Sequence, residues 1–274
     1  MVPPVGRPIV FISDFGLDDE FVGICHGVIA RIAPEARVID LTHGVPPQDI
    51  VRAALVLAEG LPYVPDDAVL LAVVDPGVGT ARRPVAVETR SGQVLVGPDN
   101  GVLSLAAEAL GGVAGAVEIT SEAVVLPSDT ETFHGRDVFA PAAAHVSAGM
   151  PLDQLGPAVD PSSLVTVKAP GPEAVEGRLE AVVLRIDRFG NVELSARPEH
   201  LKGVGLDAAE SLQVRTVWRA VRVRRVGTFG EVDEGALAVL VDSRGWLAVV
   251  QNGGNAAKAL RLEAGNPVIL EPPG

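Results

Sequence analysis

Residues 69–83 read VLLAVVDPGVGTARR, and this stretch decides how the chain folds. Its first six residues are apolar without alternation, which is typical of a strand buried on both faces of a parallel sheet. Asp75 ends the run, and a Pro-Gly pair with a second glycine then predicts a tight loop. Open α/β sheets bind ligands at the carboxyl ends of their strands, so Asp75 and Arg82 could form a charged pair facing a crevice. The same two residues could instead form an ion pair that only anchors the loop.

The segments around this stretch alternate between strand and helix patterns. Residues 8–14 are an apolar run ending at an acid, and a helical pattern follows it through residue 32. Residues 36–41 form a further strand pattern, with a helical pattern over residues 50–61 behind it. Residues 85–96 predict a β-hairpin around a Ser-Gly turn. This alternation predicts an α/β domain with a mostly parallel, helix-flanked sheet.

The pattern changes after residue 160. Residues 161–175 contain clustered Pro, Ser and Gly and are expected to be a linker between an N-terminal domain of residues 1–160 and a C-terminal domain of residues 176–274. The C-terminal part holds seven short β patterns separated by glycine and charged turns. Such spacing is typical of a small antiparallel sandwich or barrel, so we expect an all-β second domain of one of these two kinds.

Composition restricts the classes of partner. The 22 Lys and Arg residues against 35 Asp and Glu residues give a net charge of −13, which disfavours binding to nucleic acid or an anionic membrane. Cys25 is the only cysteine, so neither a disulfide framework nor a cysteine-based zinc site is expected. We see no signal-peptide pattern and no apolar run of membrane-spanning length, and we expect a soluble cytoplasmic protein.

The common catalytic motifs are missing from the sequence. None of the five histidines forms an HxxxH pair, so we expect no metal site, and no Gly-x-Ser-x-Gly, Walker or Gly-x-Gly-x-x-Gly motif occurs. His134 lies in a Phe-His-Gly-Arg-Asp segment that enters a helical pattern, and a histidine in such a place is more often structural than catalytic. Residue spacing alone therefore predicts an α/β domain and a β domain without naming an activity.

Seven motifs together go further. They are ISDFG at 12–16, DLTH at 40–43, VDPGVG at 74–79, GPDNG at 97–101, FHGRD at 133–137, IDRFGN at 186–191 and NGGNAA at 252–257. In this order the chain resembles the S-adenosylmethionine hydroxide adenosyltransferase family, which is related to fluorinase and chlorinase. The resemblance covers residues 8 to about 270. It implies an N-terminal α/β domain, a C-terminal all-β, barrel-like domain and a homotrimer with active sites between subunits.

The resemblance also implies roles for individual residues. Asp75, Arg82 and His134 match the set that handles the attacking water, and we expect Arg82 to keep Asp75 ionised while Asp75 fixes the tautomer of His134. Asp14 matches the acid that binds both ribose hydroxyls, and Asp18 is expected to line the same pocket. In the second domain the matched substrate contacts are Asp187, Phe189 and Asn191, with Phe229, Ser243 and Arg244 as further contacts.

The implied reaction is hydrolysis of S-adenosyl-L-methionine to adenosine and L-methionine, with no cofactor. Halogenases of the family carry a tyrosine where this chain has His134, and fluorinase carries a serine where this chain has Gly135. These departures favour water over halide as the nucleophile. A chlorinase-like halogenase and a non-catalytic regulator that binds an adenosyl ligand remain the alternatives.

Overall fold

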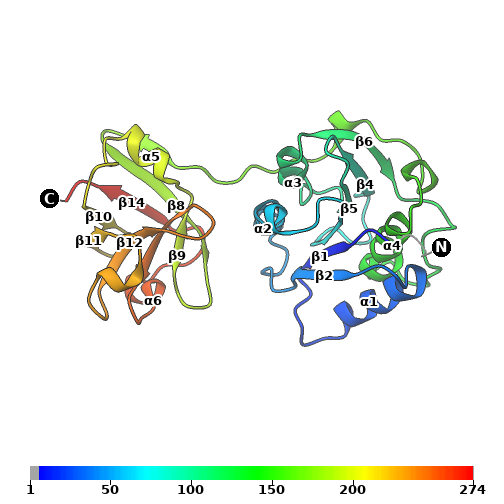
Figure 1. The fold of residues 1–274 in the computed structure, drawn as a ribbon, viewed down its shortest axis with the longest axis horizontal. Helices are drawn as coiled ribbons and strands as arrows, with labels where there is room; N and C mark the ends of the chain where they lie inside the picture. Colours follow the sequence, from blue (N-terminus) through cyan, green and yellow to red (C-terminus); the bar gives the residue numbers. More distant parts are fainter. Residues whose placement is uncertain (1–5, 274) are drawn as a thin grey trace. The chain divides into compact units, whose positions relative to one another are not determined.

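The computed structural model describes residues 6–273, and the chain divides into two compact units between Lys168 and Ala169 (Figure 1). This boundary lies within the segment 161–175 that we expected to be a linker. The first part of that segment packs on the N-terminal unit, because Asp99 Oδ1 accepts a hydrogen bond from the amide of Val165 at 2.8 Å.

The N-terminal unit is built on a six-stranded sheet in the order β2-β1-β3-β5-β4-β6. The four parallel strands are β2 (Val38–Thr42), β1 (Ile9–Ser13), β3 (Val69–Val73) and β5 (Val94–Pro98). β4 (Pro84–Thr89) runs antiparallel to both β5 and β6 (Val113–Glu118). The predicted mostly parallel sheet and its hairpin are confirmed. β3 is buried along its whole length, as its unbroken apolar run predicted.

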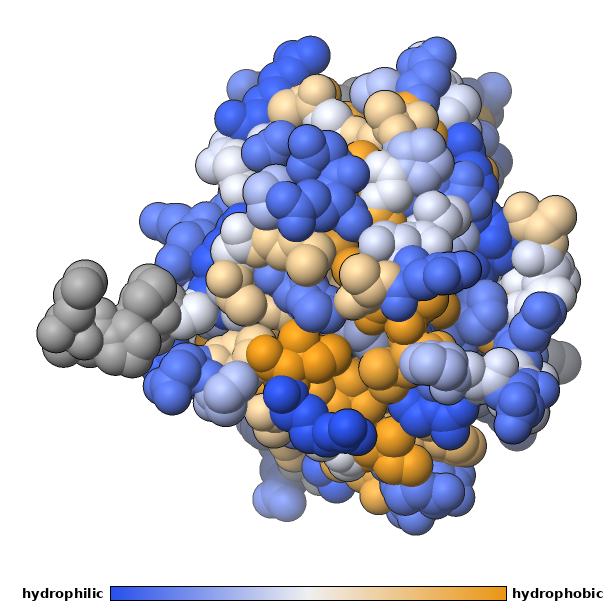
Figure 2. Space-filling view, turned by 90° about the vertical axis from the view of Figure 1, so that its right-hand side faces the viewer, coloured by the Kyte–Doolittle hydropathy of each residue, from blue (hydrophilic) through white to orange (hydrophobic). Residues whose placement is uncertain are grey.

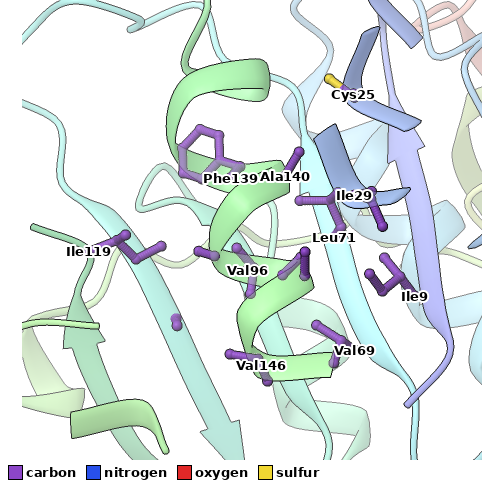
Figure 3. Close-up of a cluster of buried hydrophobic side chains, with 14 of the residues drawn as sticks. Ile9, Cys25, Ile29, Val69, Leu71, Val96, Ile119, Phe139, Ala140 and Val146 are labelled. Carbon is purple, nitrogen blue, oxygen red and sulfur yellow. The ribbon is translucent and has the colours of Figure 1, made fainter. Parts of the chain in front are cut away.

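Helices cover both faces of this sheet. On one face lie α1 (Phe21–Ile32) and α4 (Ala140–Ser147), the latter preceded by a π-helical turn, Gly135–Phe139. On the other lie α2 (Ile50–Gly60) and α3 (Ser104–Ala109). Since successive strand residues point to opposite faces, Ile9 joins the first core and Val10 the second. Figure 3 shows the first core, where Phe139 and Val146 accompany the strand residues Leu71 and Val96.

The C-terminal unit is a closed barrel. Its eight strands are β7 (Glu173–Val175), β8 (Arg178–Ile186), β9 (Val192–Leu194), β10 (Ser211–Arg215), β11 (Ala220–Arg225), β12 (Leu237–Val241), β13 (Leu247–Gln251) and β14 (Pro267–Glu271). They pair in the order β14-β10-β11-β12-β13-β9-β8-β7, and the extra pairing of β14 with β8 closes a ring of seven strands. The short helices α5 (Pro198–Gly203) and α6 (Ala256–Leu260) complete the unit. The predicted all-β, barrel-like domain is confirmed.

Hydrophilic residues cover most of the face seen in Figure 2, and hydrophobic residues gather in one part of it. Within residues 6–273, no helix has the length and apolar character that crossing a membrane requires.

Candidate functional site

A cavity of about 290 Å³ opens at the carboxyl edge of the N-terminal sheet. β1 and β3 are parallel neighbours, so Asp14, directly after β1, and Asp75, two residues after the end of β3, lie at the same edge. Both acids line the cavity together with Gln48, Val78 and His134. The structure thus brings together residues that are up to 120 positions apart in the chain, counting from Asp14 to His134.

Arg82 connects Asp75 to His134. Its Nε donates to Asp75 Oδ1 at 2.8 Å, and its Nη2 donates both to Asp75 Oδ2 and, at 2.7 Å, to His134 Nδ1. The side chains of Arg82 and Asp75 are 9% and 7% exposed, so this forked pair is largely withdrawn from water. Such bidentate, charge-assisted contacts fix the positions of both partners. The three residues form one rigid group.

The contact with Arg82 determines the tautomer of His134. A guanidinium can only donate, so Nδ1 of the imidazole accepts and the ring proton of the neutral form sits on Nε2. Burial, reinforced by the positive charge of Arg82, lowers the pKa of His134 below its usual value. His134 is therefore a neutral Nε2–H donor near pH 7. Our expectation that Asp75 fixes the tautomer of His134 was wrong in detail, because Arg82 stands between the side chains of Asp75 and His134 and contacts Nδ1 itself.

Local packing explains how His134 is placed. It immediately precedes the π-helical turn Gly135–Phe139, whose Phe139 ring lies 5.2 Å from Cζ of Arg82. Gly135 is closely packed: a Cβ atom there would stand 2.9 Å from Cζ of Phe15 and 3.1 Å from Cε2 of Phe133. Real Cβ contacts are longer, so a serine at this position would have to displace an aromatic ring.

Asp14 offers one carboxylate oxygen to the cavity. Its Oδ2 accepts a hydrogen bond at 2.8 Å from the amide of Gln48, a residue with φ of +67°. A non-glycine residue in that region is strained, and such strain often occurs at ligand sites. Oδ1 of Asp14 has no hydrogen-bond partner among residues 6–273 and keeps both lone pairs. Asp18, by contrast, is exposed and is not among the residues that line this cavity.

A second cavity, of about 460 Å³, lies in the barrel unit. All six substrate contacts expected in this part of the chain line it: Asp187, Phe189, Asn191, Phe229, Ser243 and Arg244. Phe189 and Phe229 are 73% and 44% exposed, which is unusual for phenylalanine and leaves two aromatic faces open to a planar ligand.

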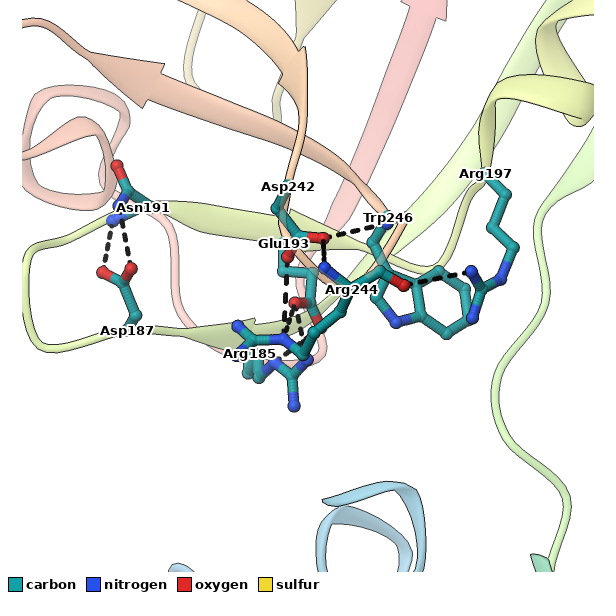
Figure 4. A network of polar contacts seen from close by, with 8 residues as sticks. All are labelled: Arg185, Asp187, Asn191, Glu193, Arg197, Asp242, Arg244 and Trp246. Carbon is teal, nitrogen blue, oxygen red and sulfur yellow. Dashed lines mark hydrogen bonds and ion pairs between the residues drawn. The ribbon is translucent and has the colours of Figure 1, made fainter. Parts of the chain in front are cut away.

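Asp187 acts within its own loop. Its Oδ1 accepts from the amides of Phe189 and Asn191, both at 2.9 Å. Its Oδ2 accepts from Nδ2 of Asn191 at 2.8 Å, and Figure 4 shows the contacts between Asp187 and Asn191. Both oxygens are thus engaged by the loop that they shape. Asn191 keeps its side-chain oxygen available, and Asp187 determines the direction in which that amide points.

Arg244 belongs to an ionic network in this cavity whose other members, Arg185, Glu193 and Asp242, were not predicted from the sequence. Glu193, 3% exposed, accepts from Arg185 Nη2 at 2.7 Å and from Arg244 Nε at 3.0 Å (Figure 4). Asp242 Oδ1 accepts from the amides of Arg244 and Trp246 at 2.8 and 3.0 Å. Burial and a hydrogen bond with the Asp242 carboxyl raise the pKa of Glu193 to about 7. Glu193 stands between Val192 and Leu194, which pack in the barrel core, so its side chain faces the cavity; a charged residue between two apolar strand residues was the available signal.

Comparison with known proteins identifies the relatives of this chain. The family model described as the SAM hydroxide adenosyltransferase N-terminal domain matches residues 9–156, and that of the C-terminal domain matches residues 181–269. The (R)-S-adenosyl-L-methionine hydrolase of Salinispora tropica is 50% identical over 258 residues, which cover 94% of this chain and 95% of that protein. A fluorinase of an Actinoplanes species is 28% identical over 298 residues, which cover 98% of this chain and 99% of the fluorinase. The crystal structure of an uncharacterized conserved protein from Thermotoga maritima superposes with a TM-score of 0.88 at 35% identity, covering 96% of this chain and 99% of the other.

Proposed function

We propose, from the membership of this chain in the SAM hydroxide adenosyltransferase family, that it is an S-adenosyl-L-methionine hydrolase. It takes S-adenosyl-L-methionine and water and releases adenosine, L-methionine and a proton. The observation that carries the proposal is the hydrogen-bonded Asp75–Arg82–His134 group, of which Asp75 and His134 line a cavity together with Asp14. No cofactor is needed, because the substrate already carries its leaving group.

The leaving group sets what the protein must supply. The sulfonium takes the electron pair of the C–S bond and leaves as neutral methionine, so no general acid is required. The new C–O bond forms at the ribose C5′ carbon, opposite sulfur, and the attacking water must lose a proton. Holding the water in line, and accepting its proton, are the two tasks left to side chains.

His134 and Asp75 divide these tasks. His134 presents Nε2–H to the water oxygen and orients it, but its Nδ1 lone pair is already engaged by Arg82. Asp75 has two oxygens with lone pairs beyond those that bind Arg82, so we assign the proton to Asp75 and from there to solvent. Arg82 is the positioning residue that holds both. It is not itself a proton acceptor, since a guanidinium stays charged.

Binding of the substrate is shared by two surfaces. In this proposal Asp14 accepts both ribose hydroxyls on its available oxygen, while the barrel cavity holds the base between Phe189, Phe229 and Asn191. Ser243 and Arg244 provide further contacts. We also propose a homotrimer in which the N-terminal unit of one subunit and the barrel of a neighbour contribute to each site, because each unit carries ligand-type motifs.

We place the protein in the cytoplasm. Its single cysteine, Cys25, is buried in the α/β core, and burial raises the pKa of its thiol to about 12. A chain without disulfides is typical of a reducing compartment.

The test is product analysis in ¹⁸O-labelled water. Incubation with S-adenosyl-L-methionine is expected to give methionine and adenosine with one ¹⁸O at the 5′ hydroxyl, unchanged by added chloride or fluoride. A 5′-halogenated nucleoside would establish the halogenase alternative, and ligand binding without turnover would establish the regulator. His134→Ala should lower turnover about 10²–10⁴-fold while adenosine still binds. His145→Ala, outside the cavity lining, is the matched control.

A further inference from the structure

Three potential metal ligands meet beside the site, outside the cavity lining. His26 comes from α1, Asp40 from β2, and His43 from the turn that follows β2. One ligand atom of each lies within 4.8 Å of the other two, and no other such group of three occurs within residues 6–273. We propose that His26, Asp40 and His43 form a divalent transition-metal site of the zinc class that is separate from the hydrolytic chemistry.

The distances suit a common ion. Nε2 of His26 and Nε2 of His43 lie 2.9 and 3.1 Å from the same oxygen, Asp40 Oδ1. Ligands bound at about 2.0–2.2 Å in a tetrahedron stand about 3.3–3.6 Å apart. The two His–Asp distances would therefore have to widen by a few tenths of an ångström to reach the separations found around a bound ion.

His43 provides the second observation. Its ring is 4% exposed, and its Nε2 makes no hydrogen bond within residues 6–273 although Asp40 Oδ1 is 3.1 Å away. Its Nδ1 lies 2.7 Å from Oγ of Ser13, which is fully buried. In one tautomer of the ring Nε2–H points at Asp40 Oδ1. In the tautomer in which Nδ1–H donates to that hydroxyl, a lone pair on Nε2 faces the Asp40 carboxylate, and a cation between them would relieve the repulsion. Metal-bound histidines typically hold their second nitrogen in this way.

The donor set selects the ion. Two imidazoles and one carboxylate suit Zn²⁺ and its neighbours Co²⁺ and Ni²⁺, whereas Mg²⁺ and Ca²⁺ prefer oxygen ligands alone. The side chains of His26 and Asp40 are 36% and 41% exposed, so water can complete the coordination and the ion can enter from solvent.

The site would also stiffen the start of the substrate cavity. The carbonyl of His43 accepts a hydrogen bond from the amide of Gly16 at 2.8 Å, and Ser13 directly precedes Asp14. A bound ion would link α1 to the turn at His43 and so restrict the motion of the loop that carries Asp14. Because none of its three ligands lines the substrate cavity, the ion would act in positioning and not in catalysis.

The experiment is equilibrium dialysis of the tag-free, chelator-treated full chain against Zn²⁺, with Co²⁺ absorption as the second readout. We expect one ion per chain, a loss of affinity of more than tenfold in His26→Gln and in Asp40→Asn, and about 10–100-fold in Ser13→Ala. His145→Gln is the control and should bind like the parent. His26 is partly exposed, so His26→Gln should keep the metal-free melting temperature. Stoichiometric binding unchanged by His26→Gln, or no binding at 100-fold excess over the chain, would show that the cluster is only hydrogen-bonded.

Discussion

Replacing Arg82 by methionine tests whether the Asp75–Arg82–His134 group acts in catalysis or only stabilises the fold. The guanidinium makes three contacts, two with Asp75 and one with His134, and all three are lost in Arg82→Met. Methionine keeps an unbranched stem that can still pack near the Phe139 ring. The substitution therefore removes the cation and the donors with little change in shape.

The magnitudes follow from burial. The Asp75 side chain, 7% exposed, would lose its cationic partner, and breaking a buried pair from one side costs about 3–5 kcal/mol. For a domain of this size each kcal/mol lowers the melting temperature by roughly 2–4 °C, so a decrease of about 6–20 °C is expected. His134 also loses the contact that sets its tautomer, and kcat/KM should fall about 10²–10⁴-fold.

Two further variants make the result decisive. Asp75→Asn combined with Arg82→Met removes the unpaired charge, so stability should recover while activity stays lost. Arg83→Met is the matched control, because Arg83 pairs with Asp99 at 3.0 Å and anchors Ser163 outside the cavity. It should lower the melting temperature and leave kcat unchanged. Calorimetry measures the change in melting temperature, and single-turnover hydrolysis measures the change in rate. If the double variant turns over at the parental rate, the Asp75–Arg82–His134 group only anchors the loop.

Three other substitutions test the remaining contacts. Asp14→Ala should weaken adenosine binding in calorimetry at least tenfold, since two charge-assisted hydrogen bonds are worth about 1.5–3 kcal/mol each; unchanged affinity would leave Asp14 as the partner of Gln48 alone. Glu193→Gln should raise KM with little change in kcat, because it weakens the contact that positions Arg244 in the substrate cavity; a fall in kcat alone would contradict this. Gly135→Ser should lower stability by about 1–3 kcal/mol in urea unfolding and reduce turnover without gaining halide use, and a parental unfolding curve would disprove the close packing.

The fold was predictable where the pattern is periodic and local. The unbroken apolar run at residues 69–74 specified a buried parallel strand, and the short β patterns after residue 176 specified a β domain. β6 escaped prediction because Val113–Glu118, with its small Ala and Gly residues, has little strand character. The choice between sandwich and barrel was not decided by sequence, because it depends on the pairing of β14 with β8, about 85 residues apart.

The site was predictable as a set of residues and less so as a set of contacts. Strand ends placed Asp14 and Asp75 correctly at one edge, since parallel neighbours share their carboxyl ends. That Arg82 lies between Asp75 and His134 is a matter of side-chain direction, which spacing does not contain. A search for histidines at helical spacing also could not find His26 with His43, because they come from a helix and a turn.

The direction of the His134 pKa shift leads to a last prediction about pH. Burial and Arg82 place the pKa of His134 in the folded chain below the value of about 6.5 that it has when unfolded. Above pH 6.5 both states are neutral and the stabilising effect is complete. As the pH falls below 6.5 the unfolded chain takes up the proton first, so this stability is lost progressively down to the folded pKa.

The pH dependence of activity should follow the pKa of His134 in the folded chain. Since a neutral Nε2–H imidazole is the form that orients water, the acid limb of kcat/KM contributed by His134 is expected below pH 6.5. Imidazole ¹⁵N spectra at pH 7 should show a proton on Nε2 of His134 and none on Nδ1. His134→Gln retains an amide donor, so it should keep part of the rate and lose this limb. A limb at or above pH 6.5 that persists in His134→Gln would mean that another group titrates, and a proton found on Nδ1 would contradict the assigned role of Arg82.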